Sequence, residues 1–337
     1  MNLPGKRCLV TGGAGFIGSH LVDRLMEIGC SVRVLDNLTN GRLENLSGHM
    51  GEEGFEFLRG SVTDPLDVGG AVEGINVIFH LACLGVRHSI VHPFENHRVN
   101  AEGTLLMLNA ACRAKACRFV YCSSSEVYGT AQYVPMPESH PANPCTVYGA
   151  SKLAGEAYTR AYHRTLEMPA VIVRPFNTYG PRSHHEGDAG EMIPKSIVRA
   201  LNGEPVMVFG DGAQTRDFTF VSDTARALAA AAETDAMIGQ TLNIGSNFEI
   251  SIKDLARKIL EMVGNPKTRI VYTAERPGDV LRLYADPRKF MGLCDWQPEE
   301  GFEEGLFQTI DFFCHHPLGL KGLIEGESGR NWEQTGK

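Results

Sequence analysis

The amino-acid sequence predicts an α/β fold, built as a doubly wound parallel sheet with a smaller α/β domain beside it. Short apolar runs that are typical of buried strands alternate with longer amphipathic runs that are typical of helices. A glycine-rich turn at residues 12–18 joins the first apolar run to the first amphipathic one. The chain has 337 residues, 43% of them hydrophobic, which is enough for one large or two modest domains.

The first unit is a strand, a glycine turn, a helix, a second strand and an acid. Residues 7–10 read as a buried strand, and residues 31–35 as a second strand that ends at Asp36. Glycines in the turn permit close approach of backbone N–H groups to a pyrophosphate, whose charge the helix N-terminus then favours. Asp36 lies 18 residues after Gly18, near the spacing of a carboxylate that binds an adenosine ribose.

This unit predicts a dinucleotide site. The Asp36 carboxylate would repel a 2′-phosphate, so we expect NAD rather than NADP, although Arg33 and Arg42 lie nearby in the sequence.

Further strands are expected at residues 76–82, 118–122 and 170–174, with helices that begin at Asn100 and Tyr148. After Pro175 the pattern changes. Helices are expected at residues 193–201, 224–232 and 252–263, the last capped by Ser251, and strands at residues 206–209 and 240–244. The alternation of strands and helices predicts a parallel sheet whose ligands bind over the carboxyl ends of its strands.

A tyrosine and a lysine four residues apart suggest catalysis. Tyr148 and Lys152 lie on one helix face, and an ammonium beside a phenol stabilises the phenolate, so Tyr148 can act as a base. The hydroxyls of residues 123–125 follow a strand and can orient a substrate hydroxyl. Glu126 adds a carboxylate that simple hydride chemistry does not need.

Composition argues against several other classes of function. The net charge is −8, the pI is about 5.9 and no basic block occurs, so nucleic acid is not an expected partner. Neither a signal segment nor an apolar run long enough for a membrane is found, and we expect a cytoplasmic protein. The nine cysteines lack C-x-x-C pairs and are expected to be reduced. His184-His185-Glu186 and His315-His316 lack further ligands at useful spacing, so no metal site is predicted.

Several motifs resemble those of the extended short-chain dehydrogenases that modify nucleotide sugars, over about residues 5–316. They are Thr-Gly-Gly-Ala-Gly-Phe-Ile-Gly at 11–18, His-Leu-Ala at 80–82, Asn100, Ser124, the Tyr148/Lys152 pair, Arg-Pro-Phe-Asn-Thr-Tyr-Gly-Pro at 174–181, Gln-Thr-Arg-Asp-Phe at 214–218 and Arg-Pro-Gly-Asp at 276–279. The resemblance implies a Rossmann-type NAD-binding domain at residues 1–176 with about 220–246. It implies a nucleotide-sugar-binding domain at 177–219 and 247–316, followed by a polar tail at 317–337.

By this resemblance, Tyr148 takes the proton of the sugar 4-hydroxyl, Lys152 binds the nicotinamide ribose and Ser124 hydrogen-bonds the 4-oxygen. The expected NAD contacts are Gly12, Gly15, Phe16, Ile17, Gly18, Asp36, Asn37, Asn40, Gly41, Ser61, Val62, Leu81, Ala82, Cys83, Asn100, Ser123, Tyr148, Lys152 and Pro175. Ser61 stands where many members carry an Asp that contacts adenine. For Asn100, a helix-capping role is an open alternative.

Asn177, Arg216 and Arg276 are expected to contact the nucleotide diphosphate. Val206 and Phe209 are expected to flank the base, which we take to be uracil because UDP-sugars are the commonest substrates of the family. Arg87 is a further cation that we expect to contact substrate. The helices that begin at Asn100 and Tyr148 resemble the family's dimer contact, so a homodimer is expected.

Three reactions of this family start from a 4-keto sugar. A 4,6-dehydratase needs a base near C5, for which Glu126 is the candidate, and an acid near O6, where Ser125 stands. A 4-epimerase needs neither group, and a UDP-glucuronate decarboxylase needs a cation for the carboxylate. The sequence favours the dehydratase, with the epimerase and then the decarboxylase as alternatives. A non-catalytic NAD-binding regulatory protein is a further alternative, which the intact Tyr148/Lys152 pair disfavours.

Overall fold

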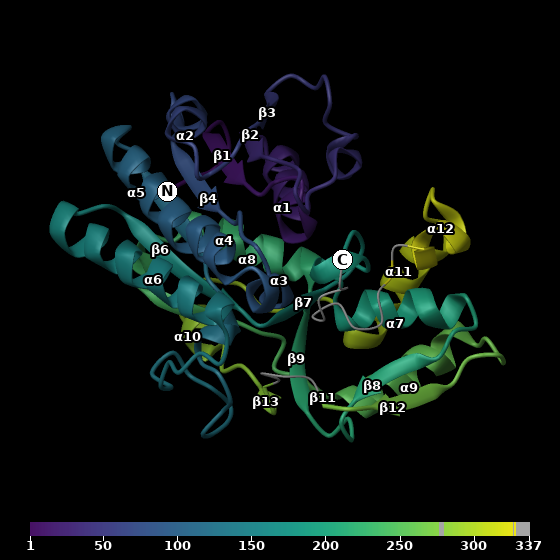
Figure 1. Cartoon of the computed structure of the whole chain (residues 1–337). Coiled ribbons are helices and arrows are strands. Elements are labelled where there is room, and N and C mark those ends of the chain that lie inside the picture. Colours follow the sequence, from purple (N-terminus) through teal and green to yellow (C-terminus); the bar gives the residue numbers. More distant parts are fainter. Residues whose placement is uncertain (276–279, 326, 328–337) are drawn as a thin grey trace.

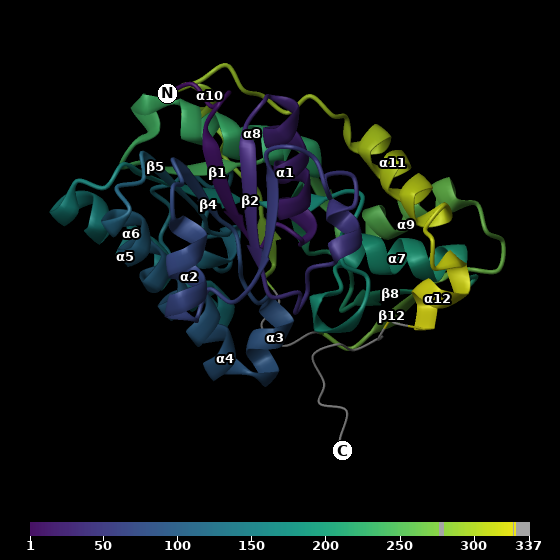
Figure 2. The same ribbon diagram turned by 90° about the horizontal axis from the view of Figure 1, so that it is seen from above.

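The computed structural model describes residues 1–275, 280–325 and 327. The largest part of the structure is a sheet of parallel strands, which can be followed in the two views of Figure 1 and Figure 2. The strands are β1 (Arg7–Thr11), β2 (Ser31–Asp36), β3 (Phe55–Arg59), β4 (Val77–His80), β5 (Arg118–Cys122), β6 (Ala170–Pro175) and β10 (Thr241–Ile244). Their order is β3-β2-β1-β4-β5-β6-β10, which confirms the predicted doubly wound sheet. The order reverses between β1 and β4, which opens a crevice at the carboxyl ends of these strands.

Helices cover both faces of this sheet because successive strand residues point to opposite sides. On one face, α1 (Phe16–Glu27) and α8 (Val221–Glu233) pack over Cys8 and Val10 of β1. On the other face, α2 (Pro65–Val72), α5 (Gly103–Arg113) and α6 (Val147–Leu166) cover Leu9 and Leu35. A π-helical turn (Arg98–Glu102) precedes α5, and the short helices α3 (Val86–Val91) and α4 (Pro93–His97) follow β4.

The smaller part of the molecule has its own apolar core. Helices α7 (Met192–Leu201), α9 (Ile252–Val263) and α11 (Phe302–Cys314) contribute to it. They pack with the strand pair β8 (Val206–Phe209) and β12 (Ile270–Thr273), and with the sheet of β7 (Asn177–Tyr179), β9 (Thr215–Phe220), β11 (Glu249–Ser251) and β13 (Arg282–Leu283). The short helix α10 (Arg288–Met291) instead packs under β10. Ser251 caps α9 as predicted, since its hydroxyl accepts from the N–H of Asp254.

The chain passes from the large sheet to the smaller part and back. Residues 177–219 leave the sheet after β6, whereas α8 and β10 return to it, with β10 pairing in parallel with β6. We retain the division into an NAD-binding and a substrate-binding domain as a proposal.

The expected polar tail from residue 317 is partly wrong. Residues Gly319–Glu325 form helix α12, which packs against α7, and Leu323 is fully buried. Leu323 and Ile324 join the apolar core of the smaller part, and this explains the packing.

No helix among the described residues is long and apolar enough to cross a membrane.

The seating of α6 on the sheet can be tested at Gly155. A Cβ added there would lie 2.2 Å from the hydroxyl oxygen of Tyr121, a side chain that is buried on β5. We expect Gly155→Ala to lower the free energy of unfolding by about 1–3 kcal/mol through overpacking. Gly70→Ala is the matched control, because Gly70 is an exposed helical glycine with no atom near its added Cβ. It should raise that free energy by about 0.5–1 kcal/mol. Urea unfolding measures both, and equal effects would contradict the close contact.

Candidate active site

A cavity of about 460 Å³ opens at the carboxyl ends of the parallel strands and continues between the large sheet and the smaller part. Most residues predicted for a site line this cavity. They are Gly12, Gly15, Phe16, Ile17, Gly18, Asp36, Asn37, Asn40, Gly41, Ser61, Val62, Leu81, Ala82, Cys83, Arg87, Ser123, Ser124, Ser125, Glu126, Tyr148, Lys152, Pro175, Asn177, Phe209 and Arg216. Arg276 lies outside the described residues.

The glycine turn brings the backbone of α1 to the cavity. Gly12 has φ +71°, and an added Cβ would lie 2.8 Å from the Cα of Ala82. A Cβ on Gly18 would lie 2.1 Å from the carbonyl oxygen of Gly12. In the described part of the chain no side chain caps α1 at Gly15, so its first N–H groups face the cavity. Such a helix N-terminus fits a pyrophosphate.

Asp36 lies at the end of β2, at the edge of the same cavity. Its carboxylate accepts hydrogen bonds from the N–H groups of Ala14 at 3.0 Å and Leu38 at 2.8 Å. Burial raises the pKa of Asp36, and these two hydrogen bonds oppose that rise. The carboxylate is therefore held in place by backbone groups, with acceptor capacity left for a ribose hydroxyl.

Tyr148 and Lys152 lie on one face of α6 and both line the cavity. The ammonium of Lys152 is buried and donates to the carbonyl oxygen of Cys122 at 2.8 Å. Burial raises the pKa of Tyr148, whereas the charge of Lys152 and a hydrogen bond with Ser124 lower it. Burial, together with the nearby Cys83 thiol, outweighs these two neighbours, so the pKa of Tyr148 stays above its ordinary value.

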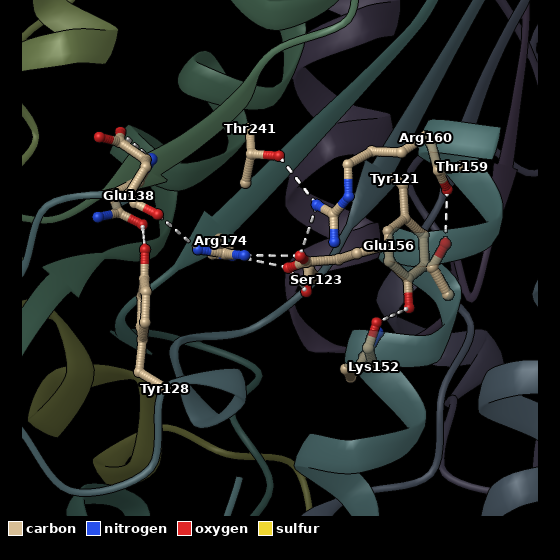
Figure 3. A network of polar contacts seen from close by, with 12 residues as sticks. Tyr121, Ser123, Tyr128, Glu138, Lys152, Glu156, Thr159, Arg160, Arg174 and Thr241 are labelled. Atoms are coloured by element: carbon tan, nitrogen blue, oxygen red, sulfur yellow. Dashed lines mark hydrogen bonds and ion pairs between the residues drawn. The ribbon is translucent and has the colours of Figure 1, made fainter. Parts of the chain in front are cut away.

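A buried ion pair holds α6 in position over the strand ends. Glu156 of α6 is fully buried and accepts from the guanidinium of Arg174 on β6 at 2.7 and 2.6 Å. Ser123 donates to the same carboxylate at 2.7 Å, and Arg160 lies 3.0 Å away, as Figure 3 shows. Although burial alone would raise it, the pKa of Glu156 is held below its usual value by Arg174 and Ser123.

Glu126 lies beside the first turn of α6. A short 3-10 turn (Ser125–Val127) places it after β5, with its N–H bonded to the hydroxyl of Ser124 at 3.2 Å. A Cβ on Gly149 would lie only 2.6 Å from the carbonyl oxygen of Glu126. Gly149 therefore allows the helix that carries Tyr148 to pack directly against the backbone of Glu126. Both side chains then line one cavity.

The smaller part supplies the opposite wall. Asn177, Phe209 and Arg216 line it, and Arg216 is buried on β9. The side-chain oxygen of Asn177 is buried and has no hydrogen-bond partner among the described residues. A buried polar atom of this kind in a cavity indicates a place for a ligand donor.

Two predicted residues lie elsewhere. Val206 is fully buried in the core of the smaller part, because residues on β8 alternate and its neighbour Met207 faces the cavity. The expectation that Val206 flanks a base is therefore wrong for the side chain as it lies in this structure, and Met207 lines the cavity in its place. Asn100 is also buried and does not line the cavity. It bonds both backbone groups of Leu84, at 2.8 and 2.9 Å, and the hydroxyl of Ser151 at 3.2 Å, so its cofactor contact stays a prediction.

Several charged residues of the cavity wall were not predicted from the sequence. Glu191, Lys195 and Arg199 lie on or just before α7 and line the cavity. Their spacing of four residues, on a helix otherwise apolar on its buried face, was the available signal. Burial raises the pKa of Glu191 to about 7, and the charge of Arg87 opposes this rise. A carboxyl group that exchanges its proton near neutral pH therefore lines the cavity.

The histidine motifs do not gather metal ligands. Among the described residues no group of three His, Cys, Asp or Glu side chains is arranged to hold an ion. Glu186 instead pairs with Arg42 and His185.

The fold and cavity define a dinucleotide-binding enzyme of the doubly wound class. The family model described as GDP-mannose 4,6 dehydratase matches residues 9–309. The chain is 38% identical to a UDP-glucose 4-epimerase of Mycolicibacterium smegmatis, over 91% of this chain and 98% of that one. It is 36% identical to UDP-glucuronic acid decarboxylase 1 of Xenopus tropicalis, over 91% and 72%.

A solved structure is similar over its whole length. It is DesIV of Streptomyces venezuelae, a dTDP-glucose 4,6-dehydratase with NAD bound, with a TM-score of 0.86 and 31% identity over 92% of this chain and 97% of that chain. The protein belongs to the extended short-chain dehydrogenase family of nucleotide-sugar epimerases, dehydratases and decarboxylases, as its sequence motifs predicted.

Removal of the Glu156 charge tests the ion pair between α6 and β6. We expect Glu156→Gln to lower the free energy of unfolding by about 3–5 kcal/mol, because it leaves the buried Arg174 without its counter-charge. The exposed pair Arg24–Glu27, at 2.8 Å, provides the control, and Glu27→Gln should cost about 0–1 kcal/mol. Urea unfolding of both variants measures the difference. A small effect of Glu156→Gln would contradict the role given to this pair.

Proposed function

We propose that the protein is an NAD-dependent nucleotide-sugar 4,6-dehydratase. The observation that carries this proposal is that Glu126 lines the same cavity as Tyr148 and packs beside it. A carboxylate at this place suits proton removal from C5 of a 4-keto sugar.

NAD is the cofactor, as predicted from the sequence, and solved relatives such as DesIV contain it. The residues fit this group. The bare N-terminus of α1 suits the pyrophosphate, Asp36 suits a ribose without a 2′-phosphate, and Lys152 suits the nicotinamide ribose. When bound, NAD accepts a hydride from C4 and returns it, to C6 in a dehydratase or to C4 in an epimerase.

The chain's own residues then move the protons. Tyr148 takes the proton of the 4-hydroxyl, and Ser124, which hydrogen-bonds Tyr148, orients the 4-oxygen. The resulting ketone acidifies C5, and Glu126 removes that proton as the C6–oxygen bond breaks. The departing oxygen needs a proton to leave as water. Ser125 is a weak acid for this step, and we assign it to Glu191, which lines the same cavity and whose pKa burial raises to about 7.

A 4-epimerase is the second candidate. The identity with the Mycolicibacterium smegmatis epimerase favours it, and that reaction would leave Glu126 and Glu191 without a chemical role. A decarboxylase is the third candidate. It is supported by the Xenopus tropicalis relative and by the cation Arg87 in the cavity.

The nucleotide-sugar substrate is proposed to lie against the smaller part, with its diphosphate at Asn177 and Arg216 and its base at Met207 and Phe209. UDP remains the proposed nucleotide, and a homodimer through α5 and α6 the proposed assembly.

The role of Glu126 can be tested with a panel of nucleotide sugars, read by product mass. We expect wild-type protein to release one water from its substrate, and Glu126→Gln to slow this release by about 10²–10⁴-fold. The same variant should still oxidise C4, seen as cofactor reduction, because Tyr148 is intact. Tyr148→Phe is the comparison and should block both steps. Unchanged water release in Glu126→Gln would refute the base assignment, and an isomer of unchanged mass would favour the epimerase.

Glu191 predicts a pH dependence. Its carboxyl has a pKa of about 7, so the protonated form that donates to the leaving oxygen is lost as pH rises through that value. We expect kcat for water release to fall above about pH 7, and Glu191→Gln to be slower and to lack this limb of the profile. Glu261→Gln, on the exposed side of α9, should keep the wild-type profile. A profile for Glu191→Gln that still falls through the same pH would contradict the assignment.

A further inference from the structure

Arg42 lies next to the carboxylate expected to hold the adenosine ribose. The backbone N–H of Arg42 donates to the carbonyl oxygen of Ala14 at 2.9 Å, and the backbone N–H of Ala14 donates to the Asp36 carboxylate at 3.0 Å. The preceding residue, Gly41, is so close that an added Cβ would lie 2.8 Å from Asp36 Oδ1. A cation at this place would ordinarily suit the 2′-phosphate of NADP.

The guanidinium of Arg42 is held by a carboxylate from a distant part of the chain. Its Nε donates to Glu186 Oε1 at 3.0 Å, and a second nitrogen contacts the same oxygen. Glu186 lies on the loop between β7 and α7, which belongs to the smaller part of the molecule.

His185 also holds the Glu186 carboxylate in place. Its Nδ1 lies 2.8 Å from Oε2, and its backbone N–H donates to that oxygen at 3.1 Å. Burial alone would raise the pKa of Glu186, yet the hydrogen bonds from His185 and Arg42 hold it well below its usual value. The side chain is therefore ionised and fixed at neutral pH.

We propose that Glu186 determines cofactor specificity, because it engages the Arg42 guanidinium and so withholds it from a 2′-phosphate. Asp36 repels that phosphate directly, and Glu186 removes the cation that would offset the repulsion. The loop between β7 and α7, which lines the cavity at His184 and Asp188, thus also sets the choice of NAD over NADP. This inference rests on the proposed cofactor site at Asp36 and is independent of which sugar reaction follows.

A second arginine, Arg33 on strand β2, provides an internal control. Arg33 donates to Glu56 at 2.7 Å and also to the carbonyl oxygens of Gly70, Ala71 and Glu73, at 3.3, 3.0 and 2.9 Å. These carbonyls would keep Arg33 in place even without Glu56. Loss of the Glu56 charge should therefore leave cofactor choice unchanged.

The test is direct binding of NADH and NADPH to the full chain, measured by calorimetry after any copurified cofactor has been removed. The proteins compared are wild type, E186Q, R42Q, the double variant R42Q/E186Q and the control E56Q. The readout is the ratio of the two Kd values, and the Kd of NADH reports that each variant is folded. We expect the preference for NADH to fall about tenfold in E186Q, since a freed guanidinium can pair with the 2′-phosphate. It should return to the wild-type value in R42Q/E186Q and stay there in R42Q and E56Q.

An unchanged ratio in E186Q would overturn the proposal, as would a fall that persists in the double variant. Wild-type protein that binds no NADH would instead overturn the cofactor site at Asp36, and the inference with it.

Discussion

The position of helix α6, which carries Tyr148 and Lys152, depends on one buried charge. Glu156 has no access to water, and an isolated carboxylate at such a place would be strongly unfavourable. Arg174 compensates with two hydrogen bonds in a planar, bidentate geometry that a lysine would not reproduce. Because the partners lie on α6 and β6, the pair fixes both the rotation and the height of the helix over the sheet. Rotation matters here, since Tyr148 and Lys152 face the cavity only in that orientation.

Two glycines make this fixed position possible at short range. Gly155 lets α6 approach the ring of Tyr121, and Gly149 lets it approach the backbone of Glu126. The Glu156–Arg174 pair fixes the orientation of α6, and the lack of side chains at Gly149 and Gly155 permits its short distance from β5 and the following turn. In consequence, residues from β5, the following turn and α6 meet within one cavity.

Features that depend on a local sequence pattern could be predicted from the sequence. The first strand–turn–helix–strand unit carries its own glycines and terminal acid, so both its fold and its place at the cavity were predictable. Strand β3 was missed because Phe55–Arg59 contains Glu56 and Arg59 and is buried only in part, as suits an edge strand. Val206 was misplaced because the face of a strand depends on register, which a four-residue run does not fix. The roles of Glu191 and Glu186 were not recognised because they depend on interactions with Arg87 and Arg42, respectively. Each arginine lies at least a hundred residues away in the chain.

The return of the chain to the large sheet has a consequence for folding. Strand β10 pairs with β6, yet the segment that carries β7, α7, β8 and β9 is synthesised between them. Until residue 244 has emerged, β6 is an edge strand with open hydrogen-bonding groups. Until α8 has emerged, Ala227 and Leu228 cannot cover the apolar side of the sheet. Completion of the sheet thus requires a long loop to close, a slow, non-local step in which the nascent chain is open to aggregation. The large sheet is therefore finished only after much of the smaller part has been synthesised.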